Sequence, residues 1–162
     1  MRDFREQTVC FTGHRDVSGN VADNLRILLR DAVIEMIKKG FRYFGTGGAL
    51  GFDTIAAQTV LGLKKEYPHI RLILVLPCKN QCLKWNENDI KIYNQILMQS
   101  DKVVYVSERY TDYCMMVRNR HLVDNSSVCI CYQAKKSGGT AATVDYAVKK
   151  GLSIVNLHDM QV

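Results

Sequence analysis

Short apolar runs alternate with amphipathic helical patterns along the whole chain, and this alternation limits the possible folds more than any other feature. In the strand expected at 71–76, every residue after Arg71 is apolar, as in a strand covered by helices on both faces of a parallel sheet. The pattern predicts strands at 8–12, 41–44, 71–76, 103–106, 128–132 and 153–156, and helices at about 20–39, 55–63, 85–98, 113–125 and 140–150. This order predicts a single Rossmann-like α/β domain over residues 1–162, with a parallel sheet between two helical layers.

The composition fits a globular protein. Of the 162 residues, 47% are apolar, which is enough to fill one sizeable core. No stretch approaches the ~18 consecutive apolar residues of a membrane span, and the first six residues lack the apolar region of a signal peptide. We therefore expect a cytoplasmic protein with no membrane partner.

The six cysteines come without a secretion signal, so most of them are expected to be reduced thiols. Cys78 and Cys82 share a loop and could pair with each other or bind a metal ion. No second ligand pair and no histidine spacing completes a tetrahedral site, so we expect no metal.

A net charge of +6 raises the question of nucleic acid binding. Lysine pairs followed by glycine close two of the helical patterns, at 38–40 and 149–151. Lysines favour the negative end of a helix and glycine provides its left-handed cap, so much of the basic excess has a local explanation. Nucleic acid stays open as a partner but is disfavoured.

A glycine-rich turn joins the second expected strand to the second helix, and its backbone can approach a ligand closely because glycine lacks a Cβ atom. The N–H groups of such a turn, together with the positive end of the next helix, can bind a phosphate. The spacing matches neither the dinucleotide fingerprint nor the Walker A pattern, so an ordinary NAD dehydrogenase or P-loop ATPase is disfavoured. The residues expected to bind a ligand in this turn are Gly45, Thr46, Gly47, Gly48, Gly51 and Asp53.

A second turn repeats this arrangement before the last helix, and two such turns predict one shared anion site. It consists of Ser137, Gly138, Gly139 and Thr140. Because the carboxyl ends of parallel strands meet at one edge of the sheet, the polar residues after the first strand should join them: Gly13, His14 and Arg15.

Several other residues admit two interpretations from the sequence. Arg118 could bind phosphate with two N–H groups or only lie on a solvated helix face. His14 could be a general base or a structural residue, and Asp53 could cap a helix or bind a ribose hydroxyl. Trp85 could pack in the core or stack on a base.

Taken together, the motifs resemble the YpsA-like branch of the SLOG superfamily, whose other branches include the LOG phosphoribohydrolases and DprA. The resemblance covers nearly the whole chain. It rests on Thr12-Gly13-His14-Arg15, on Gly47-Gly48-Ala49-x-Gly51-x-Asp53, on Arg118-Asn119-Arg120, and on Ser137-Gly138-Gly139-Thr140.

LOG enzymes have a catalytic glutamate in a glycine-rich motif and an arginine in a second motif. The resemblance places Asp145 at the glutamate position and Arg118 at the arginine position, so these two would be the catalytic residues. The chain departs from the LOG pattern at Ser137, at Ala141-Ala142 and at Asn119, which replaces a lysine.

These observations predict a protein that binds a nucleotide or a nucleotide-derived small molecule, such as a nucleoside monophosphate, ADP-ribose or NAD, as a sensor or regulator. No cofactor is required for this role. Two alternatives stay open: a nucleoside-monophosphate N-glycosidase resembling LOG, and a single-stranded nucleic acid binder resembling DprA. The resemblance also implies a homo-oligomer.

Overall fold

The computed structural model describes residues 3–160, which form a six-stranded parallel sheet with the strand order β4-β3-β2-β1-β5-β6. Each strand is short and pairs in parallel with its neighbours. The strands are β1 (Thr8–Gly13), β2 (Tyr43–Thr46), β3 (Arg71–Leu76), β4 (Lys102–Tyr105), β5 (Val128–Tyr132) and β6 (Ser153–Asn156). The predicted Rossmann-like class is confirmed.

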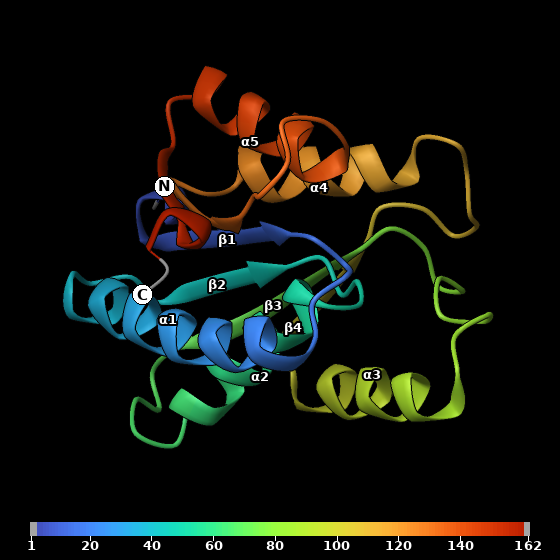
Figure 1. Ribbon diagram of the computed structural model, residues 1–162, viewed down its shortest axis with the longest axis horizontal. Helices are drawn as coiled ribbons and strands as arrows, with labels where there is room; N and C mark the ends of the chain where they lie inside the picture. The colour runs from blue at the N-terminus through green and yellow to red at the C-terminus, as the bar shows by residue number, and fades with distance from the viewer. Residues whose placement is uncertain (1–2, 161–162) are drawn as a thin grey trace.

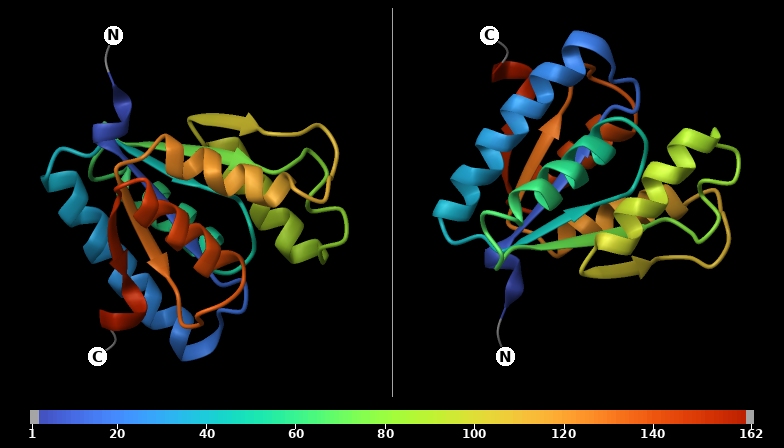
Figure 2. Two further views of the ribbon diagram at one scale, coloured as in Figure 1. Left: turned by 90° about the horizontal axis from the view of Figure 1, so that it is seen from above. Right: turned by 90° about the horizontal axis from the view of Figure 1, so that it is seen from below.

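Five α-helices cover the two faces of this sheet (Figure 1). They are α1 (Gly19–Lys38), α2 (Phe52–Leu63), α3 (Glu87–Gln99), α4 (Cys114–Asp124) and α5 (Gly139–Lys149), with short 3-10 turns η1 (Phe4–Gln7) and η2 (Leu157–Met160). Figure 2 shows α4 and α5 side by side on one face, and α1, α2 and α3 on the other. None of the helices within residues 3–160 is long and apolar enough to cross a membrane.

The larger core lies between the sheet and α1, α2 and α3. Successive strand residues point to opposite faces, so Val9 and Phe11 of β1 pack into this core while Cys10 points to the other. The smaller core, under α4 and α5, includes Cys10, Cys129 and Cys131. All six cysteines are free thiols, and Cys78 is fully buried.

The strand order reverses at β1, which pairs with β2 on one side and with β5 on the other. The chain runs outward from β1 to β4 and then crosses back to β5. Ligands of open α/β sheets bind at such a switch point, outside the carboxyl ends of the strands. The fold therefore brings the ends of β1 and β5, and the turns that follow them, to one place.

Several element boundaries differ from those expected from sequence; α2, for example, begins at Phe52. β2 begins at Tyr43, which pairs with Thr8, so Gly45 and Thr46 belong to the strand and not to the turn. α3 begins at Glu87, because the side chain of Asn86 accepts a hydrogen bond from the Asp89 N–H and caps the helix. Trp85 therefore precedes α3 instead of opening it.

Candidate functional site

A pocket of about 320 Å³ lies at the carboxyl ends of β1 and β5. Four segments form its walls: the end of β1, the first glycine turn, α4 and the second glycine turn. The lining residues are Phe11, Thr12, Gly13, His14, Arg15, Ala49, Asp53, Met115, Arg118, Asn119, Lys135, Ser137, Gly138, Gly139 and Thr140. We call it the β1–β5 pocket.

Arg118, on α4, lies deep in this pocket with only 5% of its surface exposed. Its Nη1 donates to the Gly47 carbonyl, its Nε donates to Asn119 Oδ1 at 2.6 Å, and its Nη2 lies 3.5 Å from Met115 Sδ. A guanidinium has five N–H donors, and a thioether is a weak acceptor. One N–H on each terminal nitrogen therefore has no bond to a described residue and can serve a ligand.

Asp53 is the one carboxylate among the described residues that line the pocket, and it is 7% exposed. Its Oδ2 accepts a hydrogen bond from the Ala49 N–H at 3.1 Å. Burial raises the pKa of Asp53, although the charge of Arg118 and the Ala49 bond act in the opposite direction. Asp53 thus ties the first glycine turn to the start of α2 and lies near Arg118.

Arg15 brings a second guanidinium to the same pocket. Its side chain is exposed, and its Nη2 lies 3.7 Å from Met115 Sδ. Burial lowers the pKa of Arg118, Asp53 opposes this, and the positive charge of Arg15 lowers it further. Two cations and one carboxylate therefore converge, and an anion between the guanidinium groups would relieve their repulsion.

The glycines of the first turn pack against the protein itself. A Cβ atom on Gly47 would lie 2.5 Å from Arg118 Nη1, one on Gly48 would lie 2.4 Å from Leu76 Cδ2, and one on Gly51 would lie 2.2 Å from the Arg15 carbonyl oxygen. Gly48 and Gly51 also have positive φ angles, of 69° and 75°. Only Ala49 and Asp53 of this turn line the pocket. The first turn positions the site more than it forms a cradle for a phosphate.

The second turn is open. Ser137, Gly138 and Gly139 are exposed, and a Cβ on either glycine would meet no atom of the described part of the chain within 4 Å. Gly138 has a φ of 99° and is the N-cap residue of α5, which begins at Gly139. The first N–H groups of a helix have no partner within the helix, and its dipole favours an anion there. The turn thus presents backbone donors opposite the two arginines.

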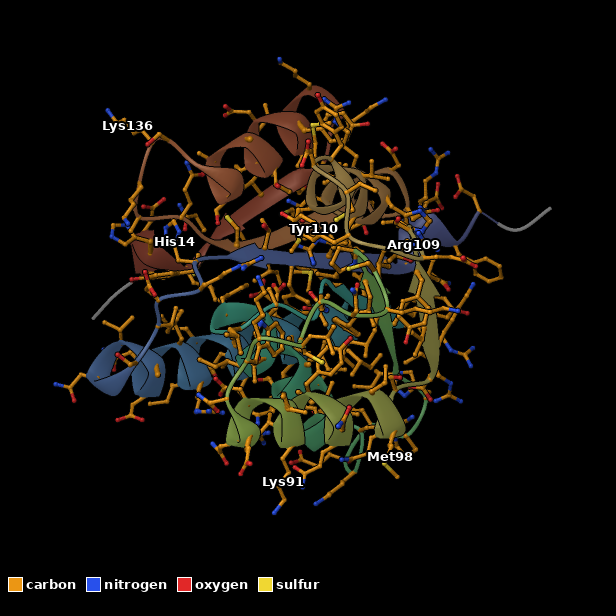
Figure 3. All side chains as sticks on the ribbon, turned by 90° about the vertical axis from the view of Figure 1, so that its right-hand side faces the viewer. His14, Lys91, Met98, Arg109, Tyr110 and Lys136 are labelled. Atoms are coloured by element: carbon orange, nitrogen blue, oxygen red, sulfur yellow. The ribbon has the colours of Figure 1, made fainter. Side chains whose placement is uncertain are left out.

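His14 positions the loop that leads into this turn. Its Nε2 accepts a hydrogen bond from the Ala134 N–H at 2.8 Å, and its ring packs edge-to-face on Tyr132 at 5.6 Å. Because Nε2 accepts, neutral His14 carries its proton on Nδ1. Burial lowers the pKa of His14, and the nearby Lys135 and His158 lower it further. In Figure 3, His14 lies beside the loop that carries Lys136.

Several residues expected at the site lie elsewhere. Gly45 and Thr46 are buried in β2, and Thr46 Oγ1 donates to the Asp53 carbonyl at 3.4 Å. Asp145 is exposed on α5 and does not line the pocket. Lys135 does line it, although the sequence did not single it out. The sequence feature that could have identified Lys135 is its position in a lysine pair directly before the second glycine turn.

These features define a class of protein: a Rossmann-like α/β domain with a positively charged pocket at the switch point of its sheet. A family model described as the YspA SLOG family (YpsA) matches residues 9–159. The chain therefore belongs to the YspA SLOG family, in agreement with the resemblance seen in its motifs.

Two relatives show similarity over most of their length. A UPF0398 protein of Brevibacillus brevis is 29% identical over 142 residues, which cover 82% of this chain and 76% of the relative. The SPbeta prophage-derived protein YoqJ of Bacillus subtilis is 30% identical over 138 residues, which cover 77% of this chain and 81% of the relative.

Two solved structures of DprA share the fold. The protein from Streptococcus pneumoniae superposes with a TM-score of 0.69 at 18% identity, over 93% of this chain and 50% of that one. The protein from Helicobacter pylori gives a TM-score of 0.66 at 21% identity, over 93% of this chain and 64% of that one. This chain thus corresponds to only part of each DprA protein, and the likeness concerns the fold alone.

Proposed function

We propose that this protein binds a nucleotide or a nucleotide-derived small molecule, with its phosphate group in the β1–β5 pocket. The observation that carries the proposal is the buried guanidinium of Arg118. Two of its N–H donors make no bond to any residue from 3 to 160, and the group lies beside Arg15 and opposite the second glycine turn. A buried cation is costly unless it is paired. A phosphate would pair both arginines at once.

The other groups of the pocket support the same ligand. Lys135 adds a third positive side chain, and the N-terminus of α5 adds backbone donors. Thr12 and Thr140 line the pocket with hydroxyl groups. A volume of about 320 Å³ accommodates a phosphate with part of a sugar and excludes a folded protein partner.

Isothermal titration calorimetry with nucleoside monophosphates, ADP-ribose and NAD tests the proposal. Arg15→Ala should weaken binding by about tenfold or more, roughly 1.4 kcal/mol, because it removes an exposed cation without opening the core. Arg109→Ala is the matched control: Arg109 is exposed on the loop before α4, outside the pocket (Figure 3). Failure of all three ligand types to bind the wild-type protein would remove the proposal.

Single-stranded DNA binding is a second candidate, because the Helicobacter pylori structure is described as showing a single-stranded DNA binding mode of DprA. The net charge of +6 is compatible with it. Phosphate-backbone binding weakens steeply as salt rises. Fluorescence anisotropy with a labelled oligonucleotide, at low and at physiological salt, decides this candidate, and an absence of binding at low salt eliminates it.

The N-glycosidase alternative remains a separate prediction. Asp145 would have to act from an exposed position on α5, whereas Asp53 is the carboxylate within the pocket. Chromatography of a long incubation with nucleoside monophosphates tests it. Binding without release of free base would leave the protein as a binder or sensor.

A further inference from the structure

A second pocket, also of about 320 Å³, lies between α2 and α3 beside the first glycine turn. Arg15 and Asp53 line this pocket as well as the β1–β5 pocket. Gly48 and Leu50 belong to its wall, whereas their neighbour Ala49 faces the β1–β5 pocket. The two pockets therefore lie on either side of one short turn and share two polar residues. We call the second one the Trp85 pocket.

The walls of the Trp85 pocket are aromatic and aliphatic. Trp85 is half-buried and packs edge-to-face on Tyr93, with ring centroids 5.4 Å apart and an interplanar angle of 88°. Leu74, Ile92 and Ile96 complete the apolar surface. An indole that is only half-buried beside a pocket retains surface for another ring, and aromatic rings attract each other beyond the effect of burial.

A minority of the residues that line the Trp85 pocket are polar. Arg15 and Arg26 supply N–H donors, and Asp53, Thr54 and Asp89 supply oxygen atoms that can accept hydrogen bonds. Arg26 Nη1 also donates to Gln58 Oε1 at 3.1 Å. An apolar slot with a few polar groups suits a flat heterocycle with nitrogen and oxygen atoms at its edges.

We propose that the Trp85 pocket binds the base of the same ligand whose phosphate lies in the β1–β5 pocket. This inference rests on the proposed function and narrows it to nucleoside phosphates. Because Asp53 and Arg15 line both pockets, the sugar of such a ligand would lie beside these two residues. The apolar side chains of the Trp85 pocket would thus select for a base. Arg15, Arg118 and the second glycine turn would bind the negatively charged phosphate.

Trp85 is the only tryptophan of the chain, so its fluorescence reports on this pocket alone. AMP and ribose 5-phosphate are titrated in parallel, with calorimetry for affinity and Trp85 emission for contact with the ring. AMP should change Trp85 emission and bind at least tenfold more tightly than ribose 5-phosphate. Ribose 5-phosphate should bind without changing the emission.

Two variants separate the base from the phosphate. Trp85→Leu should remove the preference for AMP and leave the affinity for ribose 5-phosphate unchanged. If Trp85→Leu melts at a lower temperature, Ala22→Phe provides the same test from α1, because Ala22 lines the pocket and a larger side chain would fill it. Val21→Phe, at the exposed neighbouring position outside the pocket, is the matched control.

The outcomes distinguish the two proposals. AMP and ribose 5-phosphate could bind with equal affinity, with no change of Trp85 emission on adding AMP and no change of AMP affinity in the variants. That result would show that the base does not lie in this pocket, and the phosphate site would stand. If neither compound nor any other nucleotide binds, the proposed function itself fails and this inference falls with it.

Discussion

At the scale of single residues, the site depends on side chains that support one another. The carbonyl of Gly47 accepts from Arg118, and a Cβ atom on Gly47 would overlap that guanidinium, so the glycine and the arginine require each other. Asp53 holds the turn through the Ala49 N–H. The contact between His14 and Ala134 fixes the opposite wall. The first turn needs glycine because other protein atoms lie where a Cβ would be. In the second turn, the missing side chains leave open space at the pocket.

This difference between the turns leads to a prediction for two glycine substitutions. Gly48→Ala should lower the free energy of unfolding by more than about 1 kcal/mol, because the position has positive φ and the new methyl group would overlap Leu76. Gly139→Ala should leave stability nearly unchanged, since φ is not positive there and a Cβ would meet no atom of residues 3–160 within 4 Å. Urea denaturation measures both.

Gly139→Ala should affect ligand binding even though it leaves the stability of the fold nearly unchanged. Gly139→Ala places a methyl group at the mouth of the β1–β5 pocket and should weaken AMP binding by calorimetry while the fold stays intact. A stable Gly139→Ala protein with wild-type affinity would show that the phosphate does not approach the second turn.

His14 gives stability a dependence on pH. Its folded-state pKa lies below the ordinary value of 6.5, mainly because of burial, while Lys135 and His158 lower it further and Asp16 opposes them. The unfolded chain therefore binds more protons just below pH 6.5, and the free energy of unfolding should fall as the pH drops through that region.

Chemical denaturation at several pH values between 7 and 5 measures this effect. His14→Gln retains an acceptor for the Ala134 N–H but does not titrate, so its stability should fall less over the same interval. Identical profiles for the wild type and His14→Gln would contradict the assignment of the effect to His14.

At the scale of elements, the side chain of Asp101 forms a bridge that links β3, β4 and the end of α2. Asp101, directly before β4, accepts a hydrogen bond from the Leu72 N–H of β3 at 2.8 Å and also pairs with Lys64 at the end of α2. This bridge joins three elements at the edge of the sheet opposite the site. It helps to set the register of β3 against β4, in which Ile73 pairs with Lys102.

The bridge predicts a loss of stability in acid. Burial alone would raise the pKa of Asp101, but the hydrogen bonds from Lys64 and Leu72 hold it below its ordinary value of 3.8. The stabilisation is therefore fully present above pH 3.8 and is lost as the pH falls through the lower folded-state pKa. Asp101→Asn should show a smaller loss than the wild type when thermal unfolding is followed from pH 5 to pH 2.5. Equal losses in both proteins would count against the bridge.

At the scale of the whole molecule, an exposed apolar surface lies on α4 and the loop before it. Tyr113, Met116 and Val117 are exposed at helical spacing, and Tyr110 is exposed on the loop. Contiguous exposed apolar patches often mark protein interfaces. The homo-oligomer implied by the family resemblance stays a prediction, and this surface is the place where two copies would meet.

Light scattering coupled to size-exclusion chromatography tests this expectation. The wild-type protein should elute with twice the mass of the monomer, and Val117→Glu should shift it to the monomer, because a charge at the centre of an apolar interface would be left unpaired. Lys91→Glu, on α3 and pointing away from the sheet in Figure 3, is the control for a surface charge change. A monomeric wild type at high concentration would contradict the prediction.

The sequence by itself determined the fold class and the edge of the sheet at which polar residues gather. Both follow from local properties: the length and periodicity of apolar runs, and the turn residues between them. The run 71–76 was recognisable as a central strand, and the second glycine turn, Ser137 to Thr140, was recognisable as an opening to a helix. Arg118 was singled out as a possible ligand residue, but its burial could not be read from a helix pattern.

Only the tertiary structure decided what each glycine turn does and which charges meet. Pairing with β1 placed Gly45 and Thr46 inside β2, and packing against Arg118, Leu76 and Arg15 explains the glycines of the first turn. The orientation of α5 left Asp145 in solvent, while the loop after β5 brought Lys135 to the pocket. The physical reason is that these contacts join residues far apart in the chain, and no local pattern encodes which of them approach one another.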